Sequence, residues 1–221
     1  MLPSLVIIRE YITENGANPF SKWFNKLNSQ AAAKVAVALS RIETGNLSNI
    51  KWFRGIVEYK INWGPGYRIY LAKDGHKLII LFGGGTKKSQ IMDIDKAIQL
   101  YQKYKQRKKK KRLNMANFTN DYKKTIQSRI NRDSDFAQHL LNEAISLILN
   151  DEPETARLVL RDLVNATIGF EKLSEKTQKN SKSLHRMLTA KGNPSMNNLT
   201  HIINALRETL KVDYEIHAVP A

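Results

Sequence analysis

A basic run at residues 106–112 (QRKKKKR) divides the chain into two parts that differ in the patterns that decide a fold. Before it, short β-rich segments alternate with glycine-rich turns and a few helical segments. After it, apolar residues recur almost only at helical spacing. Because a run of like charges repels itself and is usually disordered or frayed, we predict a basic linker at 106–118 between domains at 1–105 and 119–221.

The net charge is concentrated in the first part of the chain. Of the formal +16, residues 1–113 hold +15, from 22 Lys and Arg against 7 Asp and Glu, and residues 114–221 hold +1. Without the six cations of the basic run, the first part still carries +9. This excess favours a polyanionic partner, in the first place nucleic acid, because binding to phosphates releases counterions. A solvated charged run that binds nothing is the alternative.

The composition excludes several kinds of site. The chain has no cysteine, which excludes disulfides, thiolate zinc sites and cysteine nucleophiles. Its five histidines lack metal-ligand spacing, so we expect neither a metal nor a cofactor. No apolar run approaches the roughly 20 residues of a membrane span, and no secretory signal is present at the amino terminus. We therefore expect a cytoplasmic protein.

The first domain is predicted to be α+β, with a small antiparallel sheet and helices on one of its faces. Its turn signals are Gly64-Pro65-Gly66 and Asp74-Gly75, and Asn18-Pro19 is typical of a helix start. We expect Gly83–Gly85 to form a bend that ends an apolar strand. The expected elements are a strand at 5–13, helices from Pro19 and over 31–42, strands at 55–63, 67–72 and 77–82, and a helix at 93–104.

The second domain is predicted to be an all-α helix-turn-helix domain. Two of its expected helices are short and only Gln178-Lys179-Asn180 lies between them, which is the spacing of a helix-turn-helix. The expected helices are 135–150, 153–166, 170–177, 181–190 and 197–210, followed by a weak edge strand at 212–218.

Strand alternation gathers polar residues on one face of the expected hairpin. Arg68 and Tyr70 share a face of their strand, opposite the apolar Ile69. An antiparallel pairing through the glycine turn brings Glu58 and Lys60 of the preceding strand close to them. Polar strand faces are usually ordinary solvent-exposed faces with a salt bridge, and spacing alone favours that interpretation.

The stretch GIVEYKINWGPGYRIYLAKDGHKLIILFGGGTKKSQIMDIDKAIQLY resembles the RelE/HigB-type toxins of bacterial toxin–antitoxin systems, in the subgroup called addiction module killer proteins. The shared features are, in order, Glu and a basic residue on one strand, GPGYR on the next, an apolar strand ending in glycines, Lys before Ser-Gln, and Asp-Ile. The resemblance spans residues 3–105. It implies an endoribonuclease, an mRNA interferase that cleaves mRNA on the ribosome.

The same resemblance implies roles for the polar residues. Arg68 would clamp the scissile phosphate, a lysine would add charge to it, and Tyr70 would stack on a base or position the phosphate. The general base is left open between Glu58 and a lysine whose pKa neighbouring cations lower. Lys60 stands where relatives commonly carry arginine, and Thr86-Lys87-Lys88 where Asp-Lys is common. The candidate catalytic residues are Glu58, Lys60, Arg68, Tyr70 and Lys87, and the candidate RNA-binding residues are Tyr67 and Lys88.

Residues 138–206 resemble the partner antitoxins of the same subgroup, helix-turn-helix proteins related to the HigA type. The matches are Leu-x-x-x-Thr in the first short helix, Ser-Leu-x-Arg in the second, and Gly-Asn-Pro after it. The resemblance implies that the second helix enters the major groove of operator DNA. Gln178 stands where a glycine usually makes the turn. The candidate DNA contacts are Ser181, Lys182, Ser183, His185 and Arg186.

Together the two resemblances imply a toxin and its antitoxin in one polypeptide. We expect the antitoxin half to hold the toxin half inactive, with the acidic stretch Asp151–Glu154 docking on the basic toxin. We also expect a homodimer, because operator half-sites mirror a twofold protein axis. Three alternatives stay open: a DNA-binding repressor with a catalytically dead toxin-like domain, an RNA or ribosome binder without catalysis, and, for the second half, a helical interaction domain that never touches DNA.

Overall fold

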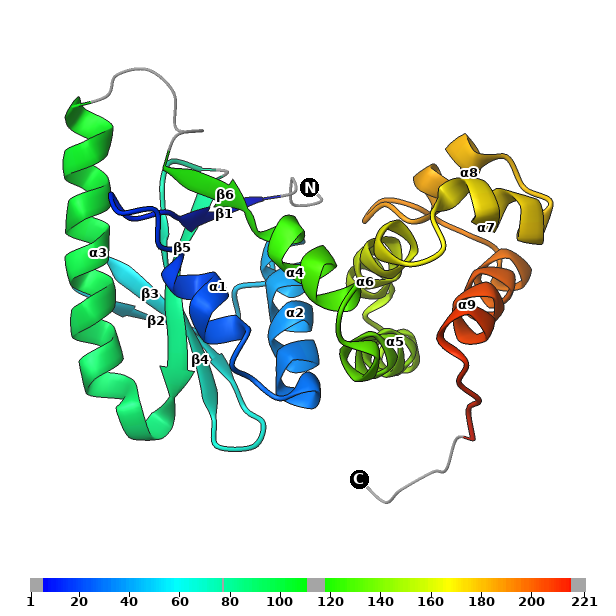
Figure 1. Cartoon of the computed structure of the whole chain (residues 1–221), viewed down its shortest axis with the longest axis horizontal. Helices are drawn as coiled ribbons and strands as arrows, with labels where there is room; N and C mark the ends of the chain where they lie inside the picture. Colours follow the sequence, from blue (N-terminus) through cyan, green and yellow to red (C-terminus); the bar gives the residue numbers. More distant parts are fainter. Residues whose placement is uncertain (1–5, 77, 111–117, 216–221) are drawn as a thin grey trace.

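The computed structural model describes residues 6–76, 78–110 and 118–215 and has an α+β architecture (Figure 1). Within these residues the sheet has six strands, in the order β2-β3-β4-β5-β1-β6. The strands are β1 (Ile7–Tyr11), β2 (Ile50–Phe53), β3 (Ile56–Ile61), β4 (Tyr67–Lys73), β5 (Leu78–Thr86) and β6 (Thr119–Asp121). Neighbouring strands are antiparallel except β1 and β5, which run parallel, so the prediction of an antiparallel sheet is wrong for that pair.

The helices begin where the sequence supplies caps. The side chain of Asn18 accepts a hydrogen bond from the backbone N–H of Ser21, and that of Asp133 accepts one from Phe136, each 2.9 Å long. In the first half of the chain (residues 1–113) the helices are α1 (Pro19–Phe24), α2 (Ser29–Glu43) and α3 (Gln90–Lys110), with a 3-10 helix, η1 (Lys87–Ser89), before α3. In the second half (residues 114–221) they are α4 (Tyr122–Ile130), α5 (Ser134–Leu149), α6 (Pro153–Ala166), α7 (Phe170–Thr177), α8 (Ser181–Met187) and α9 (Met196–Leu210).

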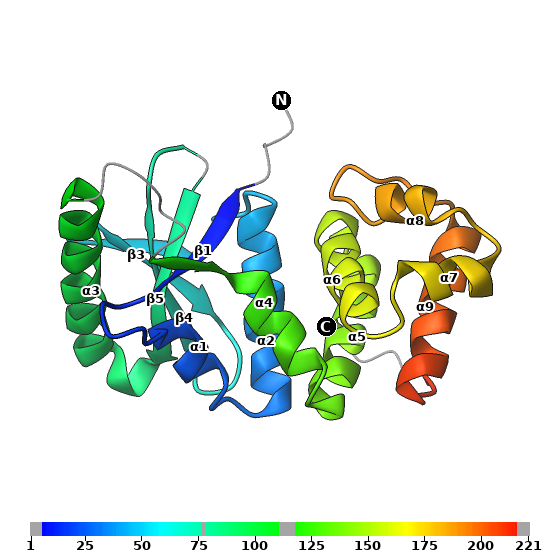
Figure 2. The ribbon, with the colours of Figure 1, turned by 45° about the horizontal axis from the view of Figure 1, so that its top comes forward.

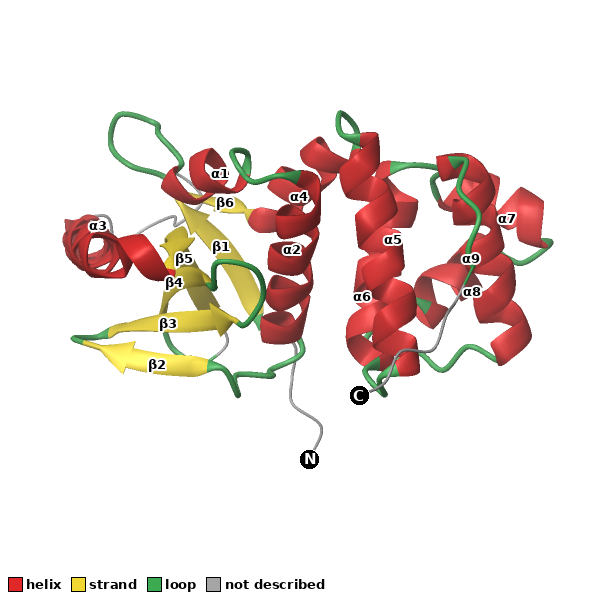
Figure 3. Cartoon of the chain, turned by 90° about the horizontal axis from the view of Figure 1, so that it is seen from below, coloured by secondary structure: helices red, strands yellow, loops and turns green. Residues whose placement is uncertain are grey.

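Helices cover both faces of the sheet, so the prediction of helices on one face is wrong (Figure 3). The helices α1 and α2 pack on the face that carries Ile69, whereas α3 packs on the opposite face, which carries Tyr70 and Phe82. The physical reason is that β4 and β5 are buried along most of their length on both sides. A sheet of this kind needs a second apolar cover, and the Ala97 and Tyr104 face of α3 supplies it.

The glycine triplet lies inside β5, which corrects the expectation of a bend there. The ladder between β4 and β5 continues to Thr86, with a register shift between Tyr70 and Leu71. A Cβ atom on Gly84 would lie 2.4 Å from the indole ring of Trp23, and one on Gly85 would lie 1.9 Å from the carboxylate of Asp93. The strand therefore needs glycine here because side chains from α1 and α3 lie directly against its backbone.

The expected linker at 106–118 begins within a helix. Instead of fraying, the basic run is helical to Lys110, the end of α3, while residues 111–117 lie outside the described part. Phe118 is fully buried in the cluster beneath α3, and Thr119 pairs with Tyr11, so that β6 extends the sheet beyond β1. The second half is therefore not all-α, because its first strand belongs to the sheet.

The two halves share one hydrophobic core. Helix α2 lies with one side on the sheet and the other on α5 and α6 (Figure 2). Small side chains along α2, such as Ala33 and Ala38, are buried there and allow close approach. The ion pair between Arg41 and Glu152, with both nitrogen–oxygen distances 2.7 Å, crosses this interface. Glu152 of the acidic stretch thus contacts Arg41 of the first half.

Some elements differ from the expectations in extent or kind. Helix α8 ends at Met187, three residues earlier than predicted. Residues 212–215 form no strand, and residues 216–218 of that expected strand lie outside the described part. The strands β2 and β6 and helix α4 were not predicted. Within the described residues, no helix combines the length and the apolar character needed to cross a membrane.

Candidate nucleic-acid sites

The predicted polar residues are neighbours in the sheet. In the register between β3 and β4, Glu58 lies opposite Tyr70 and Lys60 lies opposite Arg68. The backbone N–H of Lys87 donates a 3.1 Å hydrogen bond to the carbonyl of Gly66, in the turn before Arg68. The structure thus brings together all five candidate catalytic residues, and we call this set the Arg68 cluster.

The Arg68 cluster is closed, so the expectation of an open polar surface is wrong. Glu58 is fully buried, Tyr70 is 1% exposed and Arg68 is 8% exposed. The guanidinium Nε of Arg68 lies 3.4 Å from a carboxylate oxygen of Glu58. The side-chain amide of Gln90, at the start of α3, donates a 2.8 Å hydrogen bond to the same oxygen. The first turns of α3 therefore cover the face on which a phosphodiester would have to lie.

The buried Tyr70 hydroxyl is held in its protonated form. Burial raises the pKa of Tyr70 far above its ordinary value, and the negative charges of Glu58 and Asp93 raise it further. A phenol with a raised pKa can donate a hydrogen bond or a proton but is a poor general base at neutral pH. If this residue takes part in chemistry, its role is to stabilise a phosphate or protonate a leaving oxygen.

The remaining candidates lie at the edge of the closed face. Lys87 and Lys88 are exposed on η1, and Lys60 is partly buried. Tyr67 stacks on Trp63, with ring centroids 6.1 Å apart, so one face of its ring is occupied by protein. The exposed Lys87 and Lys88 can contact a polyanion in the described conformation, whereas the buried Glu58, Arg68 and Tyr70 cannot.

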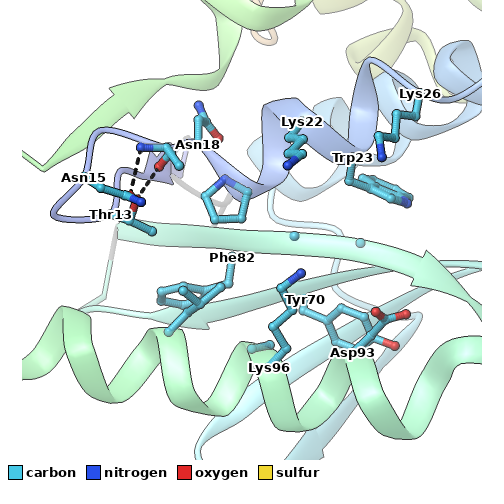
Figure 4. A pocket seen from close by; sticks show the side chains of 16 residues that line it. Thr13, Asn15, Asn18, Lys22, Trp23, Lys26, Tyr70, Phe82, Asp93 and Lys96 are labelled. Atoms are coloured by element: carbon cyan, nitrogen blue, oxygen red, sulfur yellow. Dashed lines mark hydrogen bonds between the residues drawn. The ribbon is translucent and has the colours of Figure 1, made fainter.

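A cavity of about 450 Å³ adjoins the Arg68 cluster, between α1, β5 and α3 (Figure 4). Tyr70 of the cluster lines the cavity, as does Asp93, and Tyr70 thereby connects the two places. The other side chains used below are Lys22 and Trp23 of α1, Lys26 in the turn after α1 and Lys96 of α3, with Gly83 and Gly84 of β5 as backbone surface. Sequence reasoning missed this cavity, which we call the α1–α3 pocket. A signal was present in the Lys22-Trp23 pair and in Lys26, just after the helix.

The helices described in the second half do not cover the Arg68 cluster. Helices α5 and α6 pack on α2, which lies on the opposite face of the sheet from Tyr70 and α3. The cover comes instead from α3, which belongs to the first half. The expected inhibition by the antitoxin half therefore has no direct steric basis in this structure.

Two short helices, α7 and α8, lie on either side of Gln178-Lys179-Asn180. The turn is made by Gln178, which adopts the left-handed conformation with φ 53° although it is not glycine. On α8, Lys182 and Arg186 are exposed and free to reach a ligand, while Ser181 and Ser183 are partly buried. His185 stacks on Phe170 with ring centroids 3.5 Å apart, so it packs α8 against α7 and is a weaker candidate for a base contact.

Comparison with known proteins gives a family but no activity. A protein of Haemophilus influenzae, described only as uncharacterized, is 41% identical to the chain over 85 residues, which are 38% of this chain and 86% of the relative. The chain belongs to the family of this protein. No family model matches the chain, and no solved structure matches it significantly. The function must therefore be argued from the sites themselves.

Proposed function

We propose that the chain is a toxin–antitoxin fusion, with an RNA-cleaving site in the first half that is closed in this structure and a DNA-reading helix in the second half. The observation that carries the proposal is the Arg68 cluster. It sets an arginine, lysines, a phenol and a carboxylate side by side, as attack on a phosphodiester requires, beneath a helix of the same half. The RelE/HigB and HigA resemblances support the assignment of mRNA on the ribosome and operator DNA as partners.

In this proposal α3 is the direct cover of the RNA-cleaving site. The second half stabilises the first through the shared core and the Arg41–Glu152 pair, and it does so from the opposite face of the sheet. An equilibrium between closed and open α3 would make the site available, and the ligand would have to favour the open form.

A second candidate function is a DNA-binding repressor whose first half is catalytically silent. The observation that favours it is the ion pair between Arg68 and Glu58, because a guanidinium neutralised by a buried carboxylate is not free to clamp a phosphate. Both candidates share the DNA-reading helix and differ only in whether opening α3 releases a nuclease.

The two candidates are separated by loosening α3 in the full chain. Ile94 and Ile98 are partly buried on α3 against the core beneath it, and changing both to Asp should undock the helix. We expect ribosome-dependent mRNA cleavage to rise from undetectable in the native chain to measurable in I94D/I98D, and Arg68→Ala in that background to abolish it.

The matched control is Gln99→Asp with Gln102→Asp, which adds the same charge to exposed positions of α3. It should leave the native chain inert. Circular dichroism must show that I94D/I98D remains folded. A folded, undocked variant without cleavage would favour the silent first half.

DNA binding is tested on a site selected from random duplexes by the full chain. Arg186→Ala should weaken binding to that site by about tenfold or more and relax one base position. Lys182→Ala should weaken binding to the selected site and to unrelated DNA alike. It should also lower the slope of log affinity against log salt concentration by about one. Lys103→Ala, an exposed cation on α3, is the control. Unchanged binding by Arg186→Ala would remove α8 as the reader.

The homodimer expected for operator binding stays a prediction. Light scattering at micromolar concentration should show a mass twice that of the 25.3 kDa chain. A monomer with undiminished affinity for a palindromic site would contradict it.

A further inference from the structure

We propose that the α1–α3 pocket binds a nucleotide, with the base against Trp23 and the exposed backbone of β5 and the phosphate between Lys22, Lys26 and Lys96. The proposal concerns binding and does not depend on RNA cleavage. The volume of the pocket, about 450 Å³, falls within the range of small-molecule pockets, which is about 300–1,000 Å³.

The pocket lies at a notch in the sheet. Strand β1 pairs with β5 only as far as Leu81, opposite Glu10, while β5 continues to Thr86. No described strand therefore lies beside Phe82–Thr86 on that side. Because an antiparallel strand directs the N–H and C=O groups of alternate residues to each side, part of the backbone polar groups of this segment face the notch. These groups can recognise the edge of a planar base by hydrogen bonding.

The interior of the pocket suits an aromatic base. The indole of Trp23 rests on Gly84, where a Cβ atom would approach its ring to 2.4 Å, so its position is fixed by the strand. Trp23 is partly exposed, whereas Phe82 and Tyr70, each 1% exposed, line the pocket from the other side of β5, next to α3 (Figure 4). Aromatic side chains held in place stack on bases of any sequence.

The rim of the pocket is positively charged. Lys22 lies on α1, Lys26 in the turn that follows it and Lys96 on α3, and all three are exposed. None of the three forms an ion pair with any residue that the structure describes. The carboxylate of Asp93, the acidic residue in the lining, is engaged by a 2.6 Å hydrogen bond from the Ser89 hydroxyl. The free charges at the rim therefore favour an anion.

Together, the indole of Trp23 and the cationic rim suit the two parts of a nucleotide, its base and its phosphate. A free mononucleotide and one nucleotide of an RNA chain offer the same chemistry. If the ligand is RNA, Tyr70 connects this nucleotide to the Arg68 cluster, since the residue lines both places.

The test is calorimetric titration of the full chain with 5′-AMP, adenosine, inorganic phosphate and an adenine tetraribonucleotide. We expect 5′-AMP to bind about tenfold or more tightly than adenosine or phosphate alone, a difference of about 1.4 kcal/mol. Lys26→Ala and Lys96→Ala should each lower the affinity for 5′-AMP several-fold, and Lys103→Ala should leave it unchanged. 5′-AMP should also quench tryptophan fluorescence, and the quenching should disappear in Trp23→Phe.

The tetranucleotide arm identifies the source of the ligand. If the tetranucleotide binds more tightly than 5′-AMP and loses this affinity in the same lysine variants, the ligand is one nucleotide of an RNA chain. If it binds more weakly, the ligand is a free nucleotide. Phosphate binding as tightly as 5′-AMP, or affinities unaffected by both lysine substitutions, would overturn the proposal, as would no binding at millimolar 5′-AMP. Nucleotide binding without RNA cleavage in the undocked variant would leave this inference intact and count against the proposed nuclease.

Discussion

At the scale of single residues, the buried carboxylate of Glu58 depends strongly on its partners. It is fully buried and faces one cation, Arg68, and one amide, Gln90. Removing one partner of a buried ion pair leaves the other charged and desolvated, at a cost of about 3–5 kcal/mol.

We therefore predict that Glu58→Ala lowers the free energy of unfolding by about 3 kcal/mol. Lys60→Ala, two positions along the same strand but partly exposed, should change it by less than about 0.5 kcal/mol. Urea denaturation followed by circular dichroism measures both. Equal effects of the two substitutions would contradict the assignment of a buried pair.

Asp133 joins three elements through one carboxylate. It caps α5, pairs with Arg129 at 3.1 Å and accepts a 3.0 Å hydrogen bond from the hydroxyl of Ser29. Burial alone would raise the pKa of Asp133, but the hydrogen bonds from Phe136 and Ser29 and the charge of Arg129 hold it below its ordinary value.

A carboxyl whose folded pKa is depressed contributes stability above its unfolded pKa, about 3.9, and loses it as the pH falls through the folded pKa. Asp133→Asn keeps the capping oxygen and removes the charge. We predict that it lowers the melting temperature at pH 7 and that the difference from the native chain shrinks below pH 4. A difference that stays constant from pH 7 to pH 3 would show that the charge contributes nothing.

At the scale of elements, a ring stack between His185 of α8 and Phe170 of α7 adds to the apolar contacts that hold the two helices together. His185→Ala should remove the contact with Phe170 and lower stability by about 1 kcal/mol, while leaving the base preference of the DNA site unchanged. Thermal unfolding and site selection with the variant check the two parts. A changed base preference would show that His185 takes part in base recognition.

Elements with a strong local pattern could be predicted from the sequence, and short ones that depend on distant partners could not. Helices α6 and α7 lie where apolar period and Pro153 placed them. Strand β6 has three residues and exists only because Tyr11 offers a free strand edge, which no local signal reveals. Helix α4 was missed for a related reason. Its Arg129 carries the polar signal of a surface residue, yet it is buried and donates to the carbonyls of Phe24 and Leu27.

The membership of the candidate site could be predicted, but its accessibility could not. Strand alternation and the hairpin turn were enough to bring Glu58 and Lys60 close to Arg68 and Tyr70, and the structure adds the register. Whether that face meets solvent depends on where α3 lies, which is a tertiary property. The α1–α3 pocket escaped for the same reason, since it combines α1 with a strand and a helix more than 55 residues away.

At the scale of the whole molecule, the shared core should make the two halves unfold together. All three tryptophans, Trp23, Trp52 and Trp63, lie in the first half, whereas much of the helix lies in the second. We predict coincident urea transitions by tryptophan fluorescence and by circular dichroism at 222 nm. Two separated midpoints would contradict a single cooperative unit.

The position of β6 also has a consequence for biosynthesis. The chain leaves the ribosome amino terminus first, and domains usually fold as units as they emerge. Here the outer strand of the sheet and the partners of α2 are translated after the first half is complete. In a nascent first half, the edge of β1 therefore stays unpaired and the outer apolar side of α2 stays uncovered. Both are covered only when the second half of the same chain has been synthesised.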